Sequence, residues 1–499
     1  MTRFRQILLP SAVPAILIVL ASLGCGNGNG LDASLTETTN PLVAKYSVTV
    51  PPAGGEVWVE FGPDTNYGRQ TSATPATTAG QVVDVLVAGM RANTTYHLRG
   101  HVRWPDGQTW DDQDRTFTTG TIAGLSIPRI TVQRPTPGLK PAGGVEMFSG
   151  VGPGTLVRAF VTDLQGNVIW YYNLASNAGN PTPLRNMTNG HFLMNIGDLR
   201  EIDLEGNIIR RVTVDQVNQS LAAKGYSFSI ARFHHDVIVL PNGHWITLSN
   251  YTKNYTNLEG YPGVTQVLGD ALIDIDLNGN VAWAWSSFDW LDVNRHLQAF
   301  PPDWTHSNTI IYTADGNLLV SMRHQSWILK INYANGTGDG HILWRLGWEG
   351  DFALAGGDVS EWFYAQHFPH LETTDGSNLT LDIFDNGNLR VFPNDFICSA
   401  TCYSRATVFT VDEDSKVATL NWQYLPGFYS SWGGSIGTLS NGDVEFALTT
   451  VSATSLASEI MEIAPGESQR VVWQLNLSGE NAYRGYRIPS LYPGVTWNK

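Results

Sequence analysis

Three histidines precede a turn glycine at nearly the same distance, and this spacing marks them as candidates for chemistry. His234 and His367 each lie nine residues before the glycine of the following turn. His306 lies ten residues before its turn glycine, with one extra residue just ahead of the turn. Imidazole can act as nucleophile, as acid or base near neutral pH, or as metal ligand. Three imidazoles that start equivalent strands would therefore form a reactive site if those strands converge.

The segment "DWTHSNTIIYTADGNLLVSMRHQ" adds two further polar side chains to this pattern. Side chains two apart on a strand share a face, so His306 and Asn308 point together. Hairpin pairing about the Ala-Asp-Gly turn places Arg323 opposite one of them. A merely solvated hairpin end would not require this set, so we expect His306, Asn308 and Arg323 to face a shared pocket.

The other two histidine strands differ in their second inward position. In "FHHDVIVLPNG" His234 shares its face with Asp236, and His235 points the other way unless a bulge reverses it. In "QHFPHLETTDG" Pro369 takes the second position, so that strand offers only His367.

Two kinds of chemistry suit such a cluster. Three imidazoles plus water form a common catalytic zinc shell. Arg323 argues against a metal, because its cation would repel the ion. A guanidinium instead suits a tetrahedral oxyanion, which it grips with a planar fork of donors. We therefore favour transfer of an oxyanion through a covalent histidine, without a metal or cofactor.

Repeats along the chain indicate the scaffold that must position these residues. Inner hairpins contain "MTNGHFLMN", "LPNGHWITLS", "TADGNLLVSM" and "LSNGDVEFAL". Outer hairpins such as "LIDIDLNGNVAWAW" end in Trp, and a copy without Trp, "LREIDLEGNIIRRV", makes six. Four short strands in about 60 residues are typical of a β-propeller blade. We predict an all-β chain with a six-bladed β-propeller at 125–499; a solenoid of stacked β repeats is the alternative.

The residues before the propeller divide into three parts. Residues 1–25 are typical of a lipoprotein-type signal peptide, in which "SLGC" would place the lipid on Cys25. A signal cleaved nearby and an uncleaved anchor are the alternatives. Residues 26–42 are rich in Gly, Asn and Thr and are expected to be a flexible tether. Residues 43–120 alternate apolar and polar residues and predict a small β-sandwich that resembles a fibronectin type III domain.

Export and composition limit the partners. Cys398 and Cys402 are four apart, and in an exported protein a local disulfide is favoured over a metal half-site. The formal net charge is −15 and no long Lys/Arg run occurs, so nucleic acid and anionic membrane surfaces are not expected partners. We expect a periplasmic or cell-envelope protein that contacts the membrane only through a lipid anchor.

Three motifs carry a resemblance to a known family. "FHHDVIVLPNGHW", "DWTHSNTIIYTADGNLLVSMRHQSWILKI" and "QHFPHLETTDGSNLTLDIFDNGN" resemble the bacterial arylsulfate sulfotransferases. The resemblance runs from about residue 130 to the C-terminus. It implies a six-bladed propeller that moves a sulfuryl group from a phenolic sulfate ester to a phenolic acceptor. It also implies that neither a metal nor the nucleotide donor PAPS takes part.

The resemblance also implies individual roles. His367 matches the family's nucleophile, which forms a sulfohistidine in a ping-pong reaction. His306, Asn308 and Arg323 match residues that hold the sulfuryl oxygens. The "FHHD" histidine is His234 by our spacing count, with His235 the alternative. His234 or His306 could protonate the leaving phenolate. Aromatic residues that could stack on the substrate rings, or simply pack, are Trp304, Trp362 and Trp432.

Two other functions remain compatible with the residues alone. One is a non-catalytic surface propeller that binds proteins or glycans. The other is a metal-dependent propeller hydrolase or lyase that uses the histidine ring. The motifs do not specify the physiological donor, the acceptor or an oligomeric state.

Overall fold

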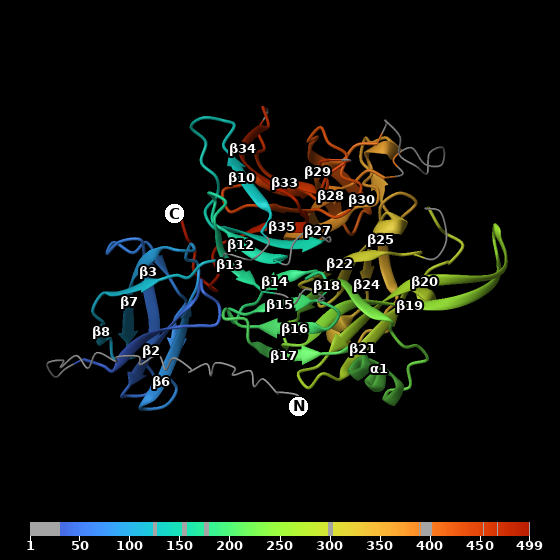
Figure 1. Ribbon diagram of the computed structural model, residues 1–499. Helices are drawn as coiled ribbons and strands as arrows, with labels where there is room; N and C mark the ends of the chain where they lie inside the picture. Colours follow the sequence, from blue (N-terminus) through green and yellow to red (C-terminus); the bar gives the residue numbers. More distant parts are fainter. Residues whose placement is uncertain are drawn as a thin grey trace, which may run out of the picture.

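The computed structural model describes residues 30–122, 127–151, 157–173, 179–297, 303–388, 390, 402–452, 454–466 and 468–498. Nearly all regular structure in this part is β-strand, which confirms the expected all-β class. The strands form a smaller body from the N-terminal part (blue in Figure 1) and a larger body from the rest. The predicted signal peptide with Cys25, and also Cys398, lie outside the described residues.

The smaller body contains two β-sheets over one core. The first sheet has the order β1–β2–β6, with bounds β1 (Ala33–Glu37), β2 (Ala44–Val50) and β6 (Gln81–Val87). The second contains β3 (Glu56–Gly62), β4 (Arg69–Gln70), β5 (Thr74–Pro75), β7 (Thr95–Arg103), β8 (Thr109–Asp111) and β9 (Arg115–Thr118). Every second residue of β2 is buried, as a strand with one face on a core requires.

The segment expected to be a tether contributes to this body. Within residues 26–42, β1 pairs with β2 along its whole length. The pairing occurs because Ala33 and Leu35, two apart on one face, pack against the hydrophobic core. Composition alone suggested a flexible segment, whereas this short alternation of apolar residues makes an edge strand.

The two bodies share a hydrophobic core. Valines of β2 and β6 pack in the same cluster as Trp170 and Ile488 of the larger body. The C-terminal residues then return to the smaller body, where Nε1 of Trp497 donates to the carbonyl of Gln70 at 3.0 Å. The N-terminal sheets are therefore fixed against the larger body.

The larger body contains six sheets of four or five strands within the described residues. The first is β11 (Val145–Val151), β12 (Ala159–Thr162) and β13 (Val168–Tyr172) with β35 (Asn481–Ile488). The second is β14 (Leu184–Asn186), β15 (Phe192–Asn195), β16 (Leu199–Ile202) and β17 (Ile208–Val212). The third is β18 (Arg232–Val239), β19 (Trp245–Leu258), β20 (Tyr261–Ile275) and β21 (Val281–Ser286).

The remaining three sheets follow in chain order. The fourth is β22 (Ser307–Tyr312), β23 (Leu318–Met322), β24 (Trp327–Ile331) and β25 (Ile342–Leu346). The fifth is β26 (Ala353–Leu354), β27 (His367–Asp375), β28 (Asn378–Asp385), β29 (Arg405–Asp412) and β30 (Val417–Tyr424). The sixth is β31 (Ser435–Thr438), β32 (Val444–Leu448), β33 (Ala457–Ala464) and β34 (Arg470–Ser478), with β10 (Arg129–Gln133) at its outer edge.

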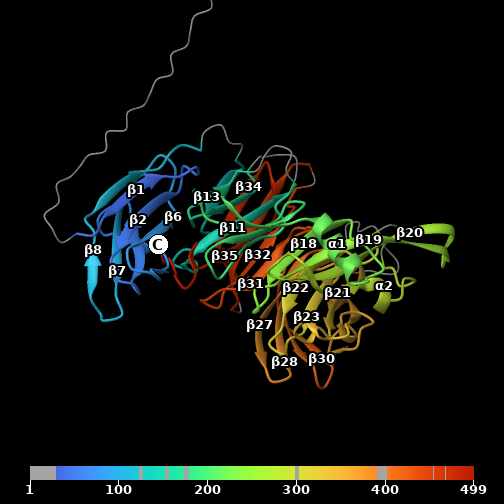
Figure 2. The same ribbon diagram turned by 90° about the horizontal axis from the view of Figure 1, so that it is seen from below.

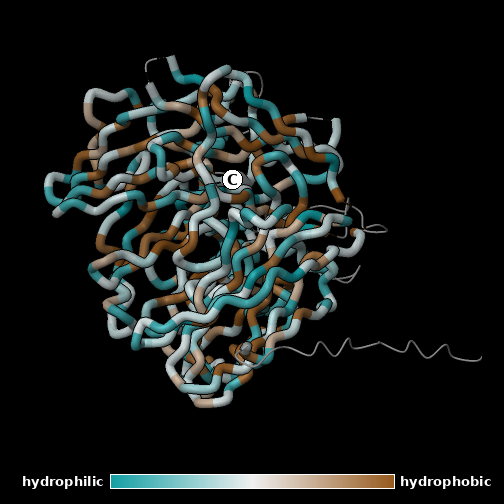
Figure 3. Tube along the Cα trace, turned by 90° about the vertical axis from the view of Figure 1, so that its left-hand side faces the viewer, coloured by the Kyte–Doolittle hydropathy of each residue, from teal (hydrophilic) through white to brown (hydrophobic). Residues whose placement is uncertain are grey.

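The innermost strands of the six sheets lie side by side in a closed order. It runs β14, β18, β22, β27, β31, β35 and back to β14. Figure 2 shows neighbouring sheets of this series from below. Figure 3 shows hydrophobic and hydrophilic stretches interleaved along the trace.

The residue near the end of an outer hairpin ties its sheet to the next. Nε1 of Trp170 donates to the carbonyl of Leu204 at 2.8 Å, in the outer turn of the second sheet. Nε1 of Trp473, in the sixth sheet, donates to the carbonyl of Leu164 in the first sheet at 3.0 Å. Where the repeat lacks Trp, the guanidinium of Arg210 donates to a carbonyl of the following outer turn. The recurring Trp therefore serves contacts between sheets.

Helices are few in the described part of the chain. They are α1 (Val214–Ala223), α2 (Ser287–Trp290) and the single 3₁₀ turns η1 (Arg323–Gln325), η2 (Ala334–Gly336) and η3 (Val359–Glu361). Thr213 and Gln216 form a capping box at the start of α1, which satisfies its first free N–H groups. None of these helices has the length and apolar character needed to cross a membrane.

Candidate functional site

A cavity of about 600 Å³ opens among the innermost strands of the larger body. Four side chains that the sequence predicts at the site line it, namely His234, His306, Arg323 and His367. His234 lies in β18, and His306 comes directly before β22. Arg323 begins η1, and His367 begins β27. Further lining residues include His235, Trp432 and Tyr483. The residues expected to converge are therefore found around one cavity.

Local breaks in the strands turn the histidines towards this cavity. His235, His306 and Phe368 have φ values of 52°, 48° and 43°, in the left-handed region that non-glycine residues rarely adopt. Each lies at or beside a shift of register between the first two strands of its sheet. By conformation His306 thus corresponds to His235, although counting from the turn had paired it with His234. Both His234 and His235 line the cavity.

His367 is held in one tautomer by Asn386. The Nδ2 of Asn386 donates to the carbonyls of Ser430 at 2.7 Å and Gly433 at 3.0 Å, so its Oδ1 is free to accept. That Oδ1 lies 2.7 Å from Nδ1 of His367, which must then be the donor. The lone pair is therefore on Nε2. The backbone N–H of Gly433 approaches Nε2 at 3.3 Å, a long bond that an incoming electrophile could replace.

The environment keeps His367 uncharged. Burial, aided by the positive charge of Arg323, lowers the pKa of His367 well below its usual range, although the bond to Asn386 acts in the opposite direction. Burial also lowers the pKa of His235 well below its usual range, with His306 and His234 adding to the effect. Neutral imidazole is the nucleophilic form, so His367 is ready to react at neutral pH.

Arg323 presents unused hydrogen-bonding capacity at the cavity. One Nη2–H donates to the carbonyl of Ser431 at 2.9 Å, and Nη1 lies 2.6 Å from Nε2 of His324. Its Nε is buried and has no hydrogen-bond partner within the described part of the chain. Burial lowers the pKa of Arg323, yet a guanidinium remains charged at any physiological pH. A buried cation with a free donor is suited to bind an anion.

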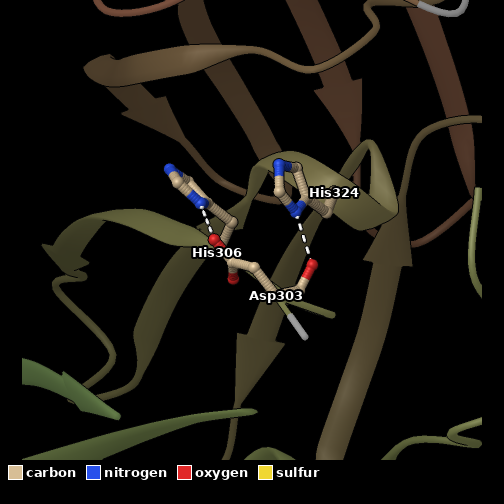
Figure 4. A group of neighbouring side chains, drawn as sticks. All are labelled: Asp303, His306 and His324. Atoms are coloured by element: carbon tan, nitrogen blue, oxygen red, sulfur yellow. Dashed lines mark hydrogen bonds and ion pairs between the residues drawn. The ribbon is translucent and has the colours of Figure 1, made fainter. Parts of the chain in front are cut away.

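Asp303 holds two imidazoles, those of His306 and His324, as Figure 4 shows. Its carboxylate accepts a hydrogen bond from Nδ1 of His306, and its backbone carbonyl accepts one from Nδ1 of His324 at 2.7 Å. Burial alone would raise the pKa of Asp303, but the bond from His306 and nearby imidazoles lower it to about 2. Burial lowers the pKa of His324 to about 3, with His306 and Arg323 contributing. Asp303 is therefore an anion and His324 is neutral.

A second carboxylate supports the other histidine pair. Nε2 of His234 lies 3.1 Å from Oδ1 of Asp270, and its Nδ1 lies 2.8 Å from Nδ1 of His235. Burial would raise the pKa of Asp270, but the interaction with His234 lowers it. Nε2 of His234 is buried beside this carboxylate without hydrogen-bond geometry, and its Nδ1 faces His235, which carries the outer imidazole of this Asp–His–His chain.

Asn308, which the sequence predicted to face the pocket, does not line the cavity. It is fully buried. Its Nδ2 donates to the carbonyl of Gln366 at 2.7 Å, directly before the candidate nucleophile His367. The register shift between Ser307 and Thr309 turns it from the expected face. Asn308 therefore fixes the backbone beside His367.

Charged residues fill the space between the inner strands. Asp236, which we expected beside His234, is completely buried and accepts from Nε and Nη2 of Arg185 at 2.9 and 2.7 Å. Nη1 of Arg484 approaches the same carboxylate at 3.3 Å, and its Nη2 donates to the carbonyl of Asn308. This network links the inner strands β14, β18, β22 and β35 to one another.

Aromatic residues contribute unevenly. Trp432 lines the cavity, whereas Trp304 and Trp362 are buried in separate hydrophobic clusters. Tyr483, which the sequence did not single out, lies edge-on to the rings of His235 and His367 with centroids 5.7 and 6.0 Å away. Burial raises the pKa of Tyr483 to about 12, so it stays a neutral phenol.

A metal centre fits this site poorly. Side-chain atoms of Asp303, His306 and His324 lie within 4.8 Å of one another, so one ion could reach all three. However, Nδ1 of each imidazole donates to an oxygen of Asp303, and Nε2 of His324 faces the Arg323 cation. An ion would have to break these bonds and lie beside a positive charge. The arrangement favours a hydrogen-bonded network.

Comparison with known proteins adds a family and weak structural likenesses. A family model described as "Arylsulfotransferase (ASST)" matches residues 154–487, more than half of the chain. No curated protein gave a significant sequence match. Streptogramin B lyase (13% identity, 70% of this chain, 98% of that chain) has a TM-score of 0.29. BamB from Moraxella catarrhalis (11% identity, 70% of this chain, 100% of that chain) also has a TM-score of 0.29.

Proposed function

The chain belongs to the arylsulfotransferase (ASST) family, and on this basis we propose that it transfers a sulfuryl group from a phenolic sulfate ester to a phenolic acceptor. The observation that carries the proposal is the state of His367. Its Nδ1–H is committed to Asn386, so Nε2 has the lone pair, and Arg323 lines the same cavity. A neutral nucleophile beside a fixed cation suits attack on an anionic ester.

In the first half-reaction, Nε2 of His367 attacks the sulfur of the bound ester. The new N–S bond forms as the bond between sulfur and the phenolic oxygen breaks, and that oxygen keeps the bonding electron pair. The three remaining sulfuryl oxygens spread negative charge towards Arg323, whose Nε has no other partner among the described residues. The departing phenolate takes a proton from an imidazole; phenol has a pKa of about 10, so this proton lowers the barrier.

In the second half-reaction an acceptor phenol occupies the position of the first. The imidazole that lost its proton recovers one from the acceptor hydroxyl, and the acceptor oxygen attacks sulfur. The N–S bond breaks and its electrons return to Nε2 of His367. One cavity thus serves donor and acceptor in turn, which is a ping-pong reaction without metal or nucleotide.

His306 is the better acid–base group of the two histidines considered from the sequence. Nε2 of His234 is buried beside Asp270, and its Nδ1 lies 2.8 Å from Nδ1 of His235. His306 uses only Nδ1, towards Asp303, and lines the cavity. Trp432 is the one of the three predicted tryptophans that could stack on a substrate ring.

We further propose that the six sheets are the blades of a six-bladed β-propeller and that the smaller body is a fibronectin-III-like module. The closed order of innermost strands and the bond from Trp473 to Leu164 support the former. Two sheets over one core support the latter. The N-terminal sequence supports export as a lipoprotein anchored through Cys25, and the spacing of Cys398 and Cys402 supports a disulfide.

Incubation with 4-nitrophenyl sulfate tests the function. We expect release of 4-nitrophenol that depends on an added phenol, with the sulfate ester of that phenol as product. With donor alone, the peptide that contains His367 should gain about 80 Da as a sulfuryl group, sought at alkaline pH because an N–S bond is acid-labile. His367→Asn should abolish both, whereas His191→Asn, in an outlying turn, should not.

The outcomes separate the competing functions. Release to water without dependence on phenol would identify a sulfatase. Activity that requires stoichiometric zinc would favour a metal-dependent hydrolase. No turnover of any aryl sulfate, with specific retention of a protein or glycan, would favour a binding module.

A further inference from the structure

Asp303 uses two different oxygens to hold two imidazoles, of which His306 lines the cavity. The carboxylate accepts from Nδ1 of His306, and the backbone carbonyl accepts from Nδ1 of His324. The two rings pack against each other with centroids 4.5 Å apart. One residue thereby determines the orientation and the proton position of both histidines.

The carboxylate suits His306 in both of its protonation states. As a cation, His306 has protons on both nitrogens; as a neutral ring, it retains Nδ1–H and exposes a lone pair on Nε2. The bond from Nδ1–H to Asp303 persists in either state. Only Nε2 then exchanges a proton, and it has no hydrogen-bond partner among the residues that the structure describes. This is what a group that protonates one phenolate and deprotonates the next phenol requires.

The backbone carbonyl has a separate effect on Arg323. Because Nδ1 of His324 must donate to that carbonyl, Nε2 is left as an acceptor. Nη1 of Arg323 lies 2.6 Å from Nε2 and can donate to it. The guanidinium is thus steered from one side by His324 and from the other by the carbonyl of Ser431.

Among the charged and titratable groups around His306, Asp303 is the carboxylate that contacts it. His235 and His324 have ring centroids 4.7 and 4.5 Å away, and both are neutral. Arg323, on η1, is the nearby cation, and its Nη1 lies 2.6 Å from Nε2 of His324. Asp270, the other nearby carboxylate, is engaged with His234 and the backbone N–H of Ser307.

We propose that Asp303 is a positioning residue that holds His306 as the acid–base group for the two phenolic oxygens and, through His324, orients Arg323 towards the sulfuryl group. This rests on the proposed sulfuryl transfer. The charge of Asp303 then supports proton donation by His306 as the bond between sulfur and the leaving oxygen breaks. Removing this charge should therefore cost most activity when the leaving phenolate is most basic.

Two donors that differ in leaving-group basicity test the inference. Phenol has a pKa of about 10, and 4-nitrophenol is more acidic by about three units. Asp303→Asn keeps an accepting oxygen but removes the charge. We expect kcat/KM to fall less than about 10-fold with 4-nitrophenyl sulfate and at least about 100-fold with phenyl sulfate. His306→Gln should show the same inequality, and the double variant should be no worse than His306→Gln.

Matched variants isolate the charge of Asp303. Asp339→Asn removes the partner of another Asp–His pair, in which Nδ1 of His341 lies 2.6 Å from Oδ1 of Asp339 in an outer turn. It should leave both donors unaffected. Asp303→Glu keeps the charge, so its loss of kcat/KM relative to the wild-type protein should be similar for the two donors. This variant also covers the case in which Asp303→Asn fails to fold.

Equal losses on both donors in Asp303→Asn, or additive losses in the double variant, would overturn the inference. So would a large donor difference in Asp303→Glu. If the wild-type protein transfers sulfuryl groups while these results are obtained, only the role of Asp303 fails. If the wild-type protein transfers none from either donor, the proposed function itself fails.

Discussion

His367 and Asn386 are joined by a 2.7 Å hydrogen bond in which the imidazole must be the donor. The direction is fixed because the amide nitrogen of Asn386 already donates to two carbonyls. Asn386, which contacts His367 directly, thus determines which ring nitrogen carries the lone pair.

Asn386→Ala should therefore lose activity without loss of fold. The vacated Nδ1 no longer requires a proton, so part of the His367 population moves its proton to Nε2 and cannot attack. We expect kcat to fall by about 100- to 10,000-fold, the upper value being the loss seen in a serine protease whose catalytic imidazole takes the wrong tautomer. Burst kinetics with 4-nitrophenyl sulfate would measure the step. An unchanged burst rate in a folded variant would show that the tautomer is set elsewhere.

The pH dependence of the first half-reaction should be flat where a free histidine would titrate. His367 is active when neutral, and its pKa is lowered well below 6.5 by burial and by Arg323. Lowering the pH from 8 to 6 therefore should not protonate it. The burst rate with 4-nitrophenyl sulfate, which needs little help from an acid, should change less than about 2-fold over this range. A fall centred near pH 6.5 would contradict a buried, neutral nucleophile.

Arg323→Lys tests geometry rather than charge. A lysine keeps one positive charge but cannot reach His324, Ser431 and the sulfuryl group together. We expect a loss of about 10- to 1,000-fold in kcat/KM, the effect of removing one charge-stabilising donor. Arg345→Lys is the matched control, because Arg345 lies on β25 and forms a partly exposed pair with Asp351. Near-normal turnover in Arg323→Lys would show that Arg323 contributes only its positive charge and not the geometry of its donors.

Stability should fall as the pH rises, because three buried glutamates surround Arg487. Its guanidinium contacts Glu146, Glu445 and Glu462 at 3.0, 2.7 and 3.2 Å. Burial raises the pKa of Glu462 to about 7 and that of Glu146 well above its usual range, with Glu445 adding repulsion. A raised folded-state pKa gives stability that is present below about pH 4.5 and is lost as the pH passes through 7.

Thermal unfolding of Glu462→Gln measures this effect. The amide cannot ionise, so the unfolding temperature of the variant should drop less between pH 5 and pH 8 than that of the wild-type protein. Glu259→Gln, exposed at the tip of the β19–β20 hairpin, should behave like wild type. Parallel curves for wild type and Glu462→Gln would show that Glu462 holds no proton in the folded state.

The outer hairpins were predictable because their turns are local chemistry. Asp276, for example, accepts hydrogen bonds from the backbone of Asn278 and Asn280, and Gly279 supplies a φ of 85°. Every one of the six outer hairpins recognised in the sequence forms a pair of strands. The function of the repeated Trp was not predictable, since its acceptor lies in another sheet.

The site was predictable in place but not in detail. Nearly equal spacing before a turn predicted that His234, His306 and His367 would meet at one cavity, because the number of residues before a hairpin turn sets the position of a side chain along its strand. A single residue with positive φ then interrupts the alternation of side chains between the two faces of the strand. This brings His235 to the cavity side and turns Asn308 away from it. The partners Asp303, Asn386 and Tyr483 come from loops and a distant strand with no fixed spacing, and only the folded chain relates them to the histidines.

The pairing of β35 with β11 has a consequence for how the protein is made. Arg487 on β35 and Glu146 on β11 are 341 positions apart in the sequence. At roughly 5 to 20 residues per second, a ribosome adds that length in about 20 to 70 s. Throughout this interval the edge of β11 has no partner strand and Tyr483 is absent from the cavity. Nascent chains therefore carry an open sheet edge, prone to pairing with other chains, and acquire a complete cavity only when β35 has been synthesised.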